Sequence, residues 1–235
     1  MKNMDYVLDV KNLSTSFISD RKEVRIVKNV SLRLRRGTTL AVVGESGCGK
    51  SVTVHSIVKL MPKNAKVTAD QVLYRSAKDG KEYRLDQMEP FGVEMRKLRG
   101  AEIGMVFQDP MSSLNPVYKV GDQVAEGLIQ HTGMSKAEAR QRVLDMFRKL
   151  GIPDPESRIS DYPHQFSGGM KQRVVIAIAM ICNPDIIIAD EPTTALDVTI
   201  QAQIMELMKS LQVNDHKSII LITHNMGLVA EMADE

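Results

Sequence analysis

The sequence predicts an α/β fold in which a mainly parallel sheet is accompanied by a small antiparallel β-layer and a helical subdomain. Three observations lead to this prediction. Short apolar runs that alternate with helical stretches indicate parallel strands joined by helical crossovers. Two stretches near the N-terminus alternate apolar and polar residues, as antiparallel strands do. A long stretch in the middle of the chain has apolar residues at three- and four-residue steps, which indicates helices without strands between them.

The composition is that of an ordinary globular protein. The chain has 235 residues, of which 43% are hydrophobic, enough for one large α/β domain or two small ones. Its 31 basic and 29 acidic residues give a net charge of +2, so nucleic acid is not expected as a partner. Cys48 and Cys182 provide no disulfide framework, which fits a reducing cytosol. The N-terminal MKNMDYVLDV has no apolar signal core, and the longest apolar run, 174–182, is far shorter than the ~20 residues of a membrane span.

The antiparallel layer is expected from the first part of the chain. Residues 6–10 and 24–34 alternate apolar and polar side chains, and a charged bend at 19–23 lies between them. Phe17 lies at the end of the first strand region. In a chain without tryptophan it is the best-placed aromatic residue to stack on an adenine ring, and a plain core role is an equal alternative.

The stretch GESGCGKS, residues 44–51, is predicted to be a phosphate-binding loop. It follows the apolar run 39–43 and precedes a stretch of helical spacing, 52–61, which is the context that this motif requires. Glycines let the backbone N–H groups face phosphate oxygens, and the helix N-terminus adds the positive end of its dipole. Lys50 supplies a positive charge and Ser51 a hydroxyl for magnesium, so the loop predicts that ATP or GTP is bound. The residues expected to contact the nucleotide here are Gly44, Glu45, Ser46, Gly47, Cys48, Gly49, Lys50, Ser51 and Val52.

The middle of the chain contains fewer candidate binding or catalytic residues. A polar, turn-rich tract at 67–85 and a short amphipathic piece at 91–98 precede a buried strand at 102–107, which ends at Gln108. A helical pattern follows, and we read residues 111–165 as a helical subdomain inserted into the α/β core. Within it, Ser135 followed by Glu138 three residues later predicts a capping box at the start of a helix.

Ser167, Gly168 and Gly169 begin the next helix, which is apolar around most of its circumference and should be buried. The glycines expose backbone N–H groups at a helix start, which makes this a second candidate for binding an anion. The alternative is that these residues only cap a core helix, with glycines at its flexible start. Taken alone, the three residues favour this alternative.

A fully apolar strand at 186–189 delivers Asp190 and Glu191 to its carboxyl end, where parallel sheets place their ligands. Next to a phosphate loop, Asp190 is expected in the shell of a magnesium ion, and Glu191 can orient or deprotonate a water molecule. A solvated pair of acids is the alternative. A helix at 198–211 and a buried strand at 218–223 follow, and the strand places His224 at the same sheet edge.

An ordered series of motifs resembles the ATP-binding subunit of ABC transporters across essentially the whole chain. GESGCGKS, Gln108, FSGGM, IIIADE, TALD and His224 match the phosphate loop, Q-loop, signature, Walker B, D-loop and H-loop of that family. QDPMSSLNP and YPHQFSGGMKQR resemble its di- and oligopeptide importer branch, which includes nickel and glutathione importers. Phe166, Met170 and Asn225 depart from the commonest family residues without removing a group that the chemistry needs. The resemblance implies a RecA-like P-loop NTPase core.

The resemblance also implies roles for individual residues. Ser51 and Gln108 would contact Mg²⁺, which Asp190 would support through water, while ATP is the nucleotide. Glu191 would be the general base, with Lys50 and His224 as further catalytic residues, His224 on the γ-phosphate. Ser167, Gly168 and Gly169 would contact the nucleotide that is bound to a second subunit. Phe17 would stack on the adenine ring, and Val24 or Ile26 is a less favoured apolar contact for that ring.

The family relationship further implies a subunit that powers a membrane importer, for di- or oligopeptides, through ATP-driven head-to-tail dimerisation. Its partners would be a second ATPase, identical or paralogous, the permease subunits and indirectly a substrate-binding protein, at the cytoplasmic face of the membrane. Members of this branch continue beyond residue 235, so we expect 1–235 to be one C-terminally truncated nucleotide-binding domain, with its core and β-layer at 1–110 and 166–235. The alternatives are a soluble ABC-type ATPase, for which the insertion is too short to hold a long coiled coil, and a non-hydrolysing nucleotide switch.

Overall fold

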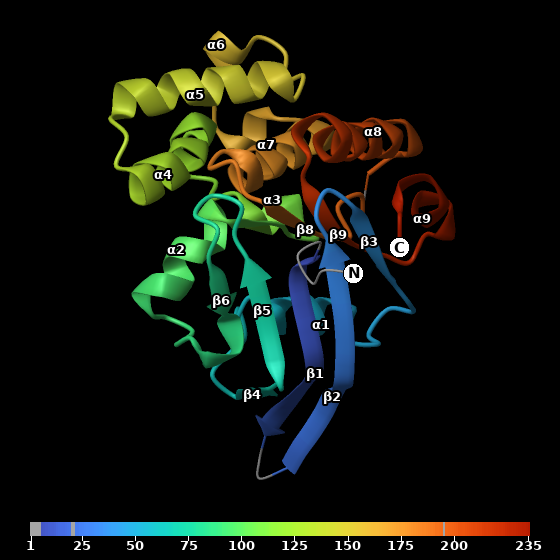
Figure 1. The fold of residues 1–235 in the computed structure, drawn as a ribbon. Helices are drawn as coiled ribbons and strands as arrows, with labels where there is room; N and C mark the ends of the chain where they lie inside the picture. The colour runs from blue at the N-terminus through green and yellow to red at the C-terminus, as the bar shows by residue number, and fades with distance from the viewer. Residues whose placement is uncertain (1–5, 20–21, 195) are drawn as a thin grey trace.

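The structure is a computed structural model that describes residues 6–19, 22–194 and 196–235. Two sheets form the lower and central parts of the molecule, and a cluster of helices forms the upper part (Figure 1). Within the described ranges, every helix is too short or too polar to cross a membrane.

The parallel sheet is the centre of the fold. Its strands are β3 (Thr39–Val43), β7 (Ile103–Val106), β8 (Ile186–Asp190) and β9 (Ser218–Thr223). They lie in the order β3-β9-β8-β7, and every neighbouring pair is parallel. All residues of β8 and β9 are buried, which explains why these strands read as unbroken apolar runs. The mainly parallel sheet predicted from the sequence is confirmed.

The antiparallel layer is larger than the sequence predicted. Its strands are β1 (Tyr6–Ser19), β2 (Lys22–Arg35), β4 (Ala65–Thr68), β5 (Gln71–Arg75) and β6 (Glu82–Arg84). The order is β2-β1-β5-β6, and β4 also pairs with β1. The tract at 67–85, predicted to be polar and turn-rich, therefore supplies most of three strands, and that prediction was wrong. The charged bend predicted at 19–23 lies partly outside the described residues.

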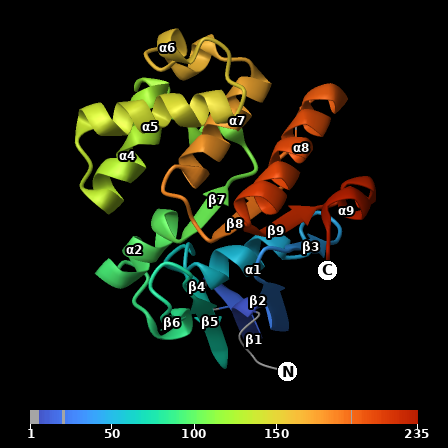
Figure 2. The same ribbon diagram turned by 45° about the horizontal axis from the view of Figure 1, so that its top comes forward.

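Helices surround the parallel sheet and fill the upper part of the molecule (Figures 1 and 2). The capping box predicted at the start of α5 is present, because Ser135 Oγ accepts from the N–H of Glu138 at 3.3 Å and the Glu138 carboxylate accepts from the N–H of Ser135 at 3.1 Å. The helices are α1 (Lys50–Ile57), α2 (Val93–Ala101), α3 (Pro110–Ser113), α4 (Val120–Thr132), α5 (Lys136–Lys149), α6 (Pro155–Arg158), α7 (Gly168–Met180), α8 (Val198–Asp215) and α9 (Met226–Met232), with 3₁₀ turns η2 (Leu85–Gln87) and η3 (Pro163–Gln165).

Alternate residues of the central strands face two separate cores. Ile187 and Ala189 of β8 pack into a cluster with residues of α4, α5, α7 and α8, whereas Ile186 and Ile188 pack into a cluster with α1 and the antiparallel sheet. This division follows from the two-residue period of a strand. The sheet is therefore fixed from both sides, which gives the residues at its carboxyl edge a rigid base.

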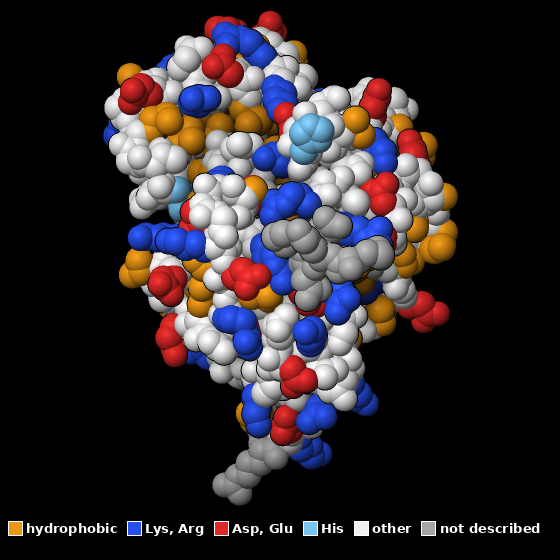
Figure 3. Space-filling model, viewed as in Figure 1, with side chains coloured by type: hydrophobic (Ala, Val, Ile, Leu, Met, Phe, Trp, Pro, Cys, Tyr) orange, Lys and Arg blue, Asp and Glu red, His pale blue; other side chains and the backbone are white. Residues whose placement is uncertain are grey.

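On the face shown in Figure 3, basic and acidic side chains are interspersed over the lower part of the molecule. Hydrophobic side chains form a band just beneath α5, within the upper cluster of helices.

Candidate nucleotide-binding site

The carboxyl ends of the four parallel strands meet at one edge of the sheet. Val43 of β3 is in register with Thr223 of β9, Asp190 of β8 with Ile222 of β9, and Val106 of β7 with Ala189 of β8. The segments that follow these strands therefore begin side by side. They carry the phosphate-loop candidate and the residues Gln108, Glu191 and His224.

The loop between β3 and α1 has the backbone geometry of a tight turn around a bound group. Gly47 and Gly49 have φ angles of 79° and 98°, which side-chain-bearing residues rarely adopt. A Cβ atom on Gly49 would also come within 3.2 Å of Ile26 Cγ2 on β2, so the loop packs closely against the antiparallel sheet. α1 begins directly behind the loop, with its N-terminal N–H groups at the site.

The ammonium group of Lys50 is held over this loop. It donates hydrogen bonds to the carbonyl oxygens of Gly44 at 2.7 Å and Glu45 at 2.8 Å. The Lys50 side chain is buried, whereas residues 45–48 are exposed. An exposed loop thus surrounds a buried positive charge that is fixed in position, an arrangement suited to phosphate oxygens.

Ser51 and Asp190 form a pair of oxygen groups beside the loop. Ser51 Oγ donates to Asp190 Oδ1 at 2.9 Å, and burial raises the pKa of the Asp190 carboxyl. Hard cations such as Mg²⁺ prefer oxygen ligands and retain several water molecules, so this pair fits a magnesium ion that phosphate and water complete. In the described part of the chain, no three His, Cys, Asp or Glu side chains are grouped to hold a metal by themselves.

Glu191 is the centre of the hydrogen-bond network at this edge. Its carboxylate accepts from Gln108 Nε2 at 3.1 Å and from Thr194 Oγ1 at 3.0 Å, and it lies 3.4 Å from His224 Nδ1. These partners fix both carboxylate oxygens. Thr194 was not predicted from the sequence as a site residue. Its place three residues after Glu191, in the loop that follows β8, is the signal that could have indicated it.

The residues Ser167 to Gly169 have a structural role in this chain. Ser167 Oγ caps α7 by accepting from the N–H of Met170 at 3.3 Å. Gly169 is buried, and a Cβ atom there would lie 2.7 Å from Ile200 Cγ2 on α8. Ser167 and Gly168 remain exposed. Figures 1 and 2 both place α7 with the upper helices, apart from α1, so the fold does not bring these residues to the phosphate loop of the same chain.

Phe17 is half-buried on β1, where it pairs with Val24 of β2 and Ala65 of β4. Val24 is 53% exposed and Ile26 is 38% exposed. Ile26 is the one of the three that packs against Gly49. An aromatic ring and two apolar side chains are therefore available on the antiparallel sheet beside the loop, and the fold alone does not select one of them for an adenine ring.

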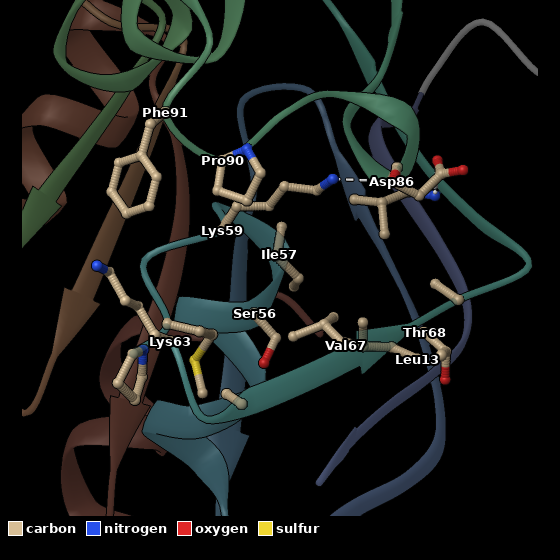
Figure 4. A pocket seen from close by; sticks show the side chains of 15 residues that line it. Leu13, Ser56, Ile57, Lys59, Lys63, Val67, Thr68, Asp86, Pro90 and Phe91 are labelled. Carbon is tan, nitrogen blue, oxygen red and sulfur yellow. Dashed lines mark hydrogen bonds between the residues drawn. The ribbon is translucent and has the colours of Figure 1, made fainter. Parts of the chain in front are cut away.

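A cavity of about 470 Å³ lies outside this edge, between the end of α1, β4, β5 and the segment before α2 (Figure 4). Leu13, Ile57 and Val67 give it apolar walls. The ammonium group of Lys59, which reaches across it, donates to the carbonyl oxygen of Asp86 at 2.9 Å. None of the candidate site residues lines this cavity, so it is separate from the nucleotide site.

Comparison with known proteins supports the motif assignments. A family model described as "ABC transporter" matches residues 27–194. The chain is 54% identical to the dipeptide transport ATP-binding protein DppD of Bacillus subtilis, over 98% of the chain and 67% of that protein. It is 51% identical to the oligopeptide transport ATP-binding protein OppD of B. subtilis, over 97% of the chain and 62% of that protein. The glutathione import ATP-binding protein GsiA of Salmonella typhimurium is 48% identical over 97% of the chain and 36% of its own length. The chain thus spans about two thirds or less of these relatives.

Solved structures have the same fold. The ATP-binding cassette MJ0796, in a dimeric post-hydrolysis state bound to ADP and Pi, superposes with a TM-score of 0.78 at 29% identity, over 94% of this chain and 89% of that chain. CbiO1 from Clostridium perfringens, part of the ABC transporter complex cbiONQ, superposes with a TM-score of 0.76 at 27% identity, over 98% of this chain and 83% of that chain.

Proposed function

Because the chain belongs to the ABC transporter family, in the branch of the dipeptide, oligopeptide and glutathione import ATP-binding proteins, we propose that it hydrolyses ATP to power peptide import across a membrane. The observation that carries this proposal is the Glu191 carboxylate, which is held by Gln108, Thr194 and His224 beside the Ser51–Asp190 pair. That arrangement offers a base next to the groups that would hold phosphates and magnesium.

In the proposed mechanism, Glu191 is the general base. An ionised carboxylate only accepts hydrogen bonds, so after binding Gln108, Thr194 and His224 it retains lone pairs for a water molecule. The water proton passes to this carboxylate as the water oxygen attacks the γ-phosphorus. The bond between the γ-phosphorus and the β,γ-bridging oxygen breaks, and ADP leaves with that bond's electron pair. Lys50 binds the phosphates, and His224, whose Nδ1 faces Glu191, has its Nε2 available for the γ-phosphate.

Ser51 and Gln108 would hold Mg²⁺ directly, and Asp190 would act through water. When bound, the ion neutralises negative charge on the phosphates. Gln108 is suited to this role because its amide nitrogen donates to Glu191 and its amide oxygen is left for a cation. Phe17 would stack on the adenine ring, with Val24 or Ile26 as alternative apolar contacts.

We propose that Ser167, Gly168 and Gly169 meet the nucleotide of a second ATPase subunit, identical or paralogous, in a head-to-tail dimer. Two observations support this. The exposed residues Ser167 and Gly168 lie at the N-terminus of α7, where N–H groups can bind an anion, and α7 is apart from the phosphate loop of the same chain. The dimeric cassette with ADP and Pi is a relative with this fold.

We propose that the membrane partners are permease subunits, which would place the protein at the cytoplasmic face of the membrane, with a substrate-binding protein as an indirect partner. A hollow of about 440 Å³ next to the nucleotide site could receive a segment of a permease subunit, which supports this proposal. It is lined mostly by apolar side chains, among them Leu60, Phe91 and Phe107, and Phe107 directly precedes Gln108. We propose that residues 111–165 form a helical subdomain and that 1–110 and 166–235 form the core. The helical subdomain would contact the permease subunits, so crosslinks between the two are expected.

The experiment that tests the proposed function uses Glu191→Gln. This variant should keep ATP bound while phosphate release falls by orders of magnitude, and it should dimerise with ATP but stay monomeric with ADP. Adding Ser167→Arg should abolish the dimer and leave ATP binding intact. Light scattering and nucleotide titration decide the outcome. ATP-dependent dimers that persist in the double variant would show that Ser167 only caps α7, and wild-type protein that binds ATP without releasing phosphate would indicate a nucleotide switch.

A further inference from the structure

His55 faces the same carboxylate as Ser51. It lies four residues after Ser51 on α1, so the two side chains share one side of the helix. Ser51 Oγ donates to Oδ1 of Asp190, and His55 Nε2 lies 3.8 Å from Oδ2 of Asp190. The helix therefore directs one polar group at each oxygen of a buried acid.

The Nε2 atom of His55 is buried and has no hydrogen-bond partner in the described part of the chain. Such atoms are rare in folded proteins and need a physical explanation. Its distance of 3.8 Å from Asp190 Oδ2 is about 0.8 Å beyond hydrogen-bond length, which a small rotation of either side chain can close. The structure thus shows a donor position next to a carboxylate oxygen that it could serve.

The ring of His55 also contacts the ring of Phe107. Its centroid lies 6.1 Å from that of Phe107, with the planes at 62°, which is an edge-on aromatic contact. A neutral imidazole carries a single proton, and with that proton on Nε2 the ring can donate a hydrogen bond from this atom. A neutral ring in a fixed orientation acts by hydrogen bonding and not by charge.

We propose that His55 is a positioning residue for Asp190, donating a hydrogen bond from Nε2 to Oδ2 and so fixing the plane of the carboxylate. This inference rests on the proposed function, in which Asp190 supports Mg²⁺ through water. A carboxylate held only at Oδ1 by Ser51 can still turn about its Cβ–Cγ bond, whereas a second donor at Oδ2 stops that motion. A fixed carboxylate orders the water around the ion in advance, so Mg²⁺-dependent nucleotide binding should depend on His55.

Three substitutions separate this role from packing. His55→Gln places an amide nitrogen near the position of Nε2, while His55→Asn places it near Nδ1, so only the glutamine should replace the proposed donor. His55→Phe keeps a ring against Phe107 and removes both nitrogens. Binding of a fluorescent ATP analogue is measured as MgCl₂ is titrated, and again in EDTA.

In His55→Phe and His55→Asn, the Mg²⁺ concentration for half-maximal binding should rise about three- to ten-fold, the range expected for one hydrogen bond. In His55→Gln it should stay within about two-fold of wild type, and binding in EDTA should be equal in all four proteins. Wild-type Mg²⁺ dependence in His55→Phe, equal behaviour of the glutamine and asparagine variants, or an equal loss of binding in EDTA would overturn the inference. Wild-type protein that binds the analogue without dependence on Mg²⁺ would refute the proposed magnesium site itself, and the inference with it.

Discussion

Substitution of Gly169 by alanine tests the packing of α7 against α8. The added Cβ atom would lie 2.7 Å from Ile200 Cγ2 and 3.3 Å from Ile200 Cδ1, so one helix must shift or the isoleucine must leave its rotamer. Overpacking of this kind costs about 1–3 kcal/mol, and the higher helix propensity of alanine offsets roughly 0.5–1 kcal/mol of it. The midpoints of these two ranges leave a net cost of about 1.25 kcal/mol. For a chain of this size, 1 kcal/mol corresponds to about 2–4 °C, so the melting temperature should fall by roughly 3–5 °C.

Gly168→Ala is the matched control. Its Cβ atom would meet only Leu196 Cδ2, at 3.6 Å, which is ordinary van der Waals contact. Gly168 is exposed at the first position of α7, so alanine there should leave the melting temperature unchanged or raise it slightly. Thermal unfolding of both variants without nucleotide gives the comparison, because partner contacts do not enter the measurement.

A double variant identifies the cause of the loss. Ile200→Ala removes the atoms that the new Cβ would strike, so Gly169→Ala combined with Ile200→Ala should be less destabilised than the sum of the single variants. Gly169→Ala that melts at the wild-type temperature, or losses that simply add in the double variant, would refute the packing argument. The glycine would then be explained only by the proposed contact with the nucleotide of a second subunit.

Three further predictions concern the nucleotide site. Lys50→Ala removes the ammonium that is held over the loop, so calorimetry should show a strong loss of ATP affinity, and wild-type affinity would contradict the phosphate-loop assignment. Phe17→Ala should weaken ATP binding about five-fold, or about 1 kcal/mol, if the ring stacks on adenine, whereas a core role would lower the melting temperature at unchanged affinity. Burial holds the pKa of Asp190 above its usual range, so the folded chain keeps the carboxyl proton to a higher pH than the unfolded chain does. The folded state therefore loses stability as the pH rises from about 4 through the raised pKa. Asp190→Asn should therefore melt above wild type at neutral pH without nucleotide, with a difference that shrinks toward pH 4, and a constant difference across pH would exclude this cause.

Much of the fold could be predicted because its central strands are buried on both faces. Such strands appear as continuous apolar runs, and parallel connections place their carboxyl ends at one edge. The gathering of Gln108, Glu191 and His224 follows from that rule alone. The short strands β4, β5 and β6 were missed because they contain only three to five residues, too few for an alternating pattern to stand out from turn-forming residues around them.

The packing of the α7 start against α8 was also beyond the sequence. Both interpretations of Ser167 to Gly169 rested on local chemistry, a cap and an anion site, while the packing of Gly169 depends on Ile200, which is distant in sequence. Periodicity shows that α7 is buried, but it does not show which helix approaches which residue.

The backbone conformation of Glu191 is a feature of the site that the sequence does not indicate. Its φ angle is 47°, a left-handed conformation that glutamate rarely adopts and that nothing in the sequence indicates. The turn is fixed by the neighbouring strand, because the N–H of Glu191 donates to the carbonyl oxygen of Ile222 at 3.0 Å. The same turn brings the carboxylate to Gln108, Thr194 and His224, which come from three different segments. A strained residue that the surrounding sheet holds in place is a common feature of functional sites, since the strain persists only where its contacts outweigh it. Local propensity therefore fails at Glu191 because contacts with the neighbouring strand, and not the residue's own preference, fix its backbone.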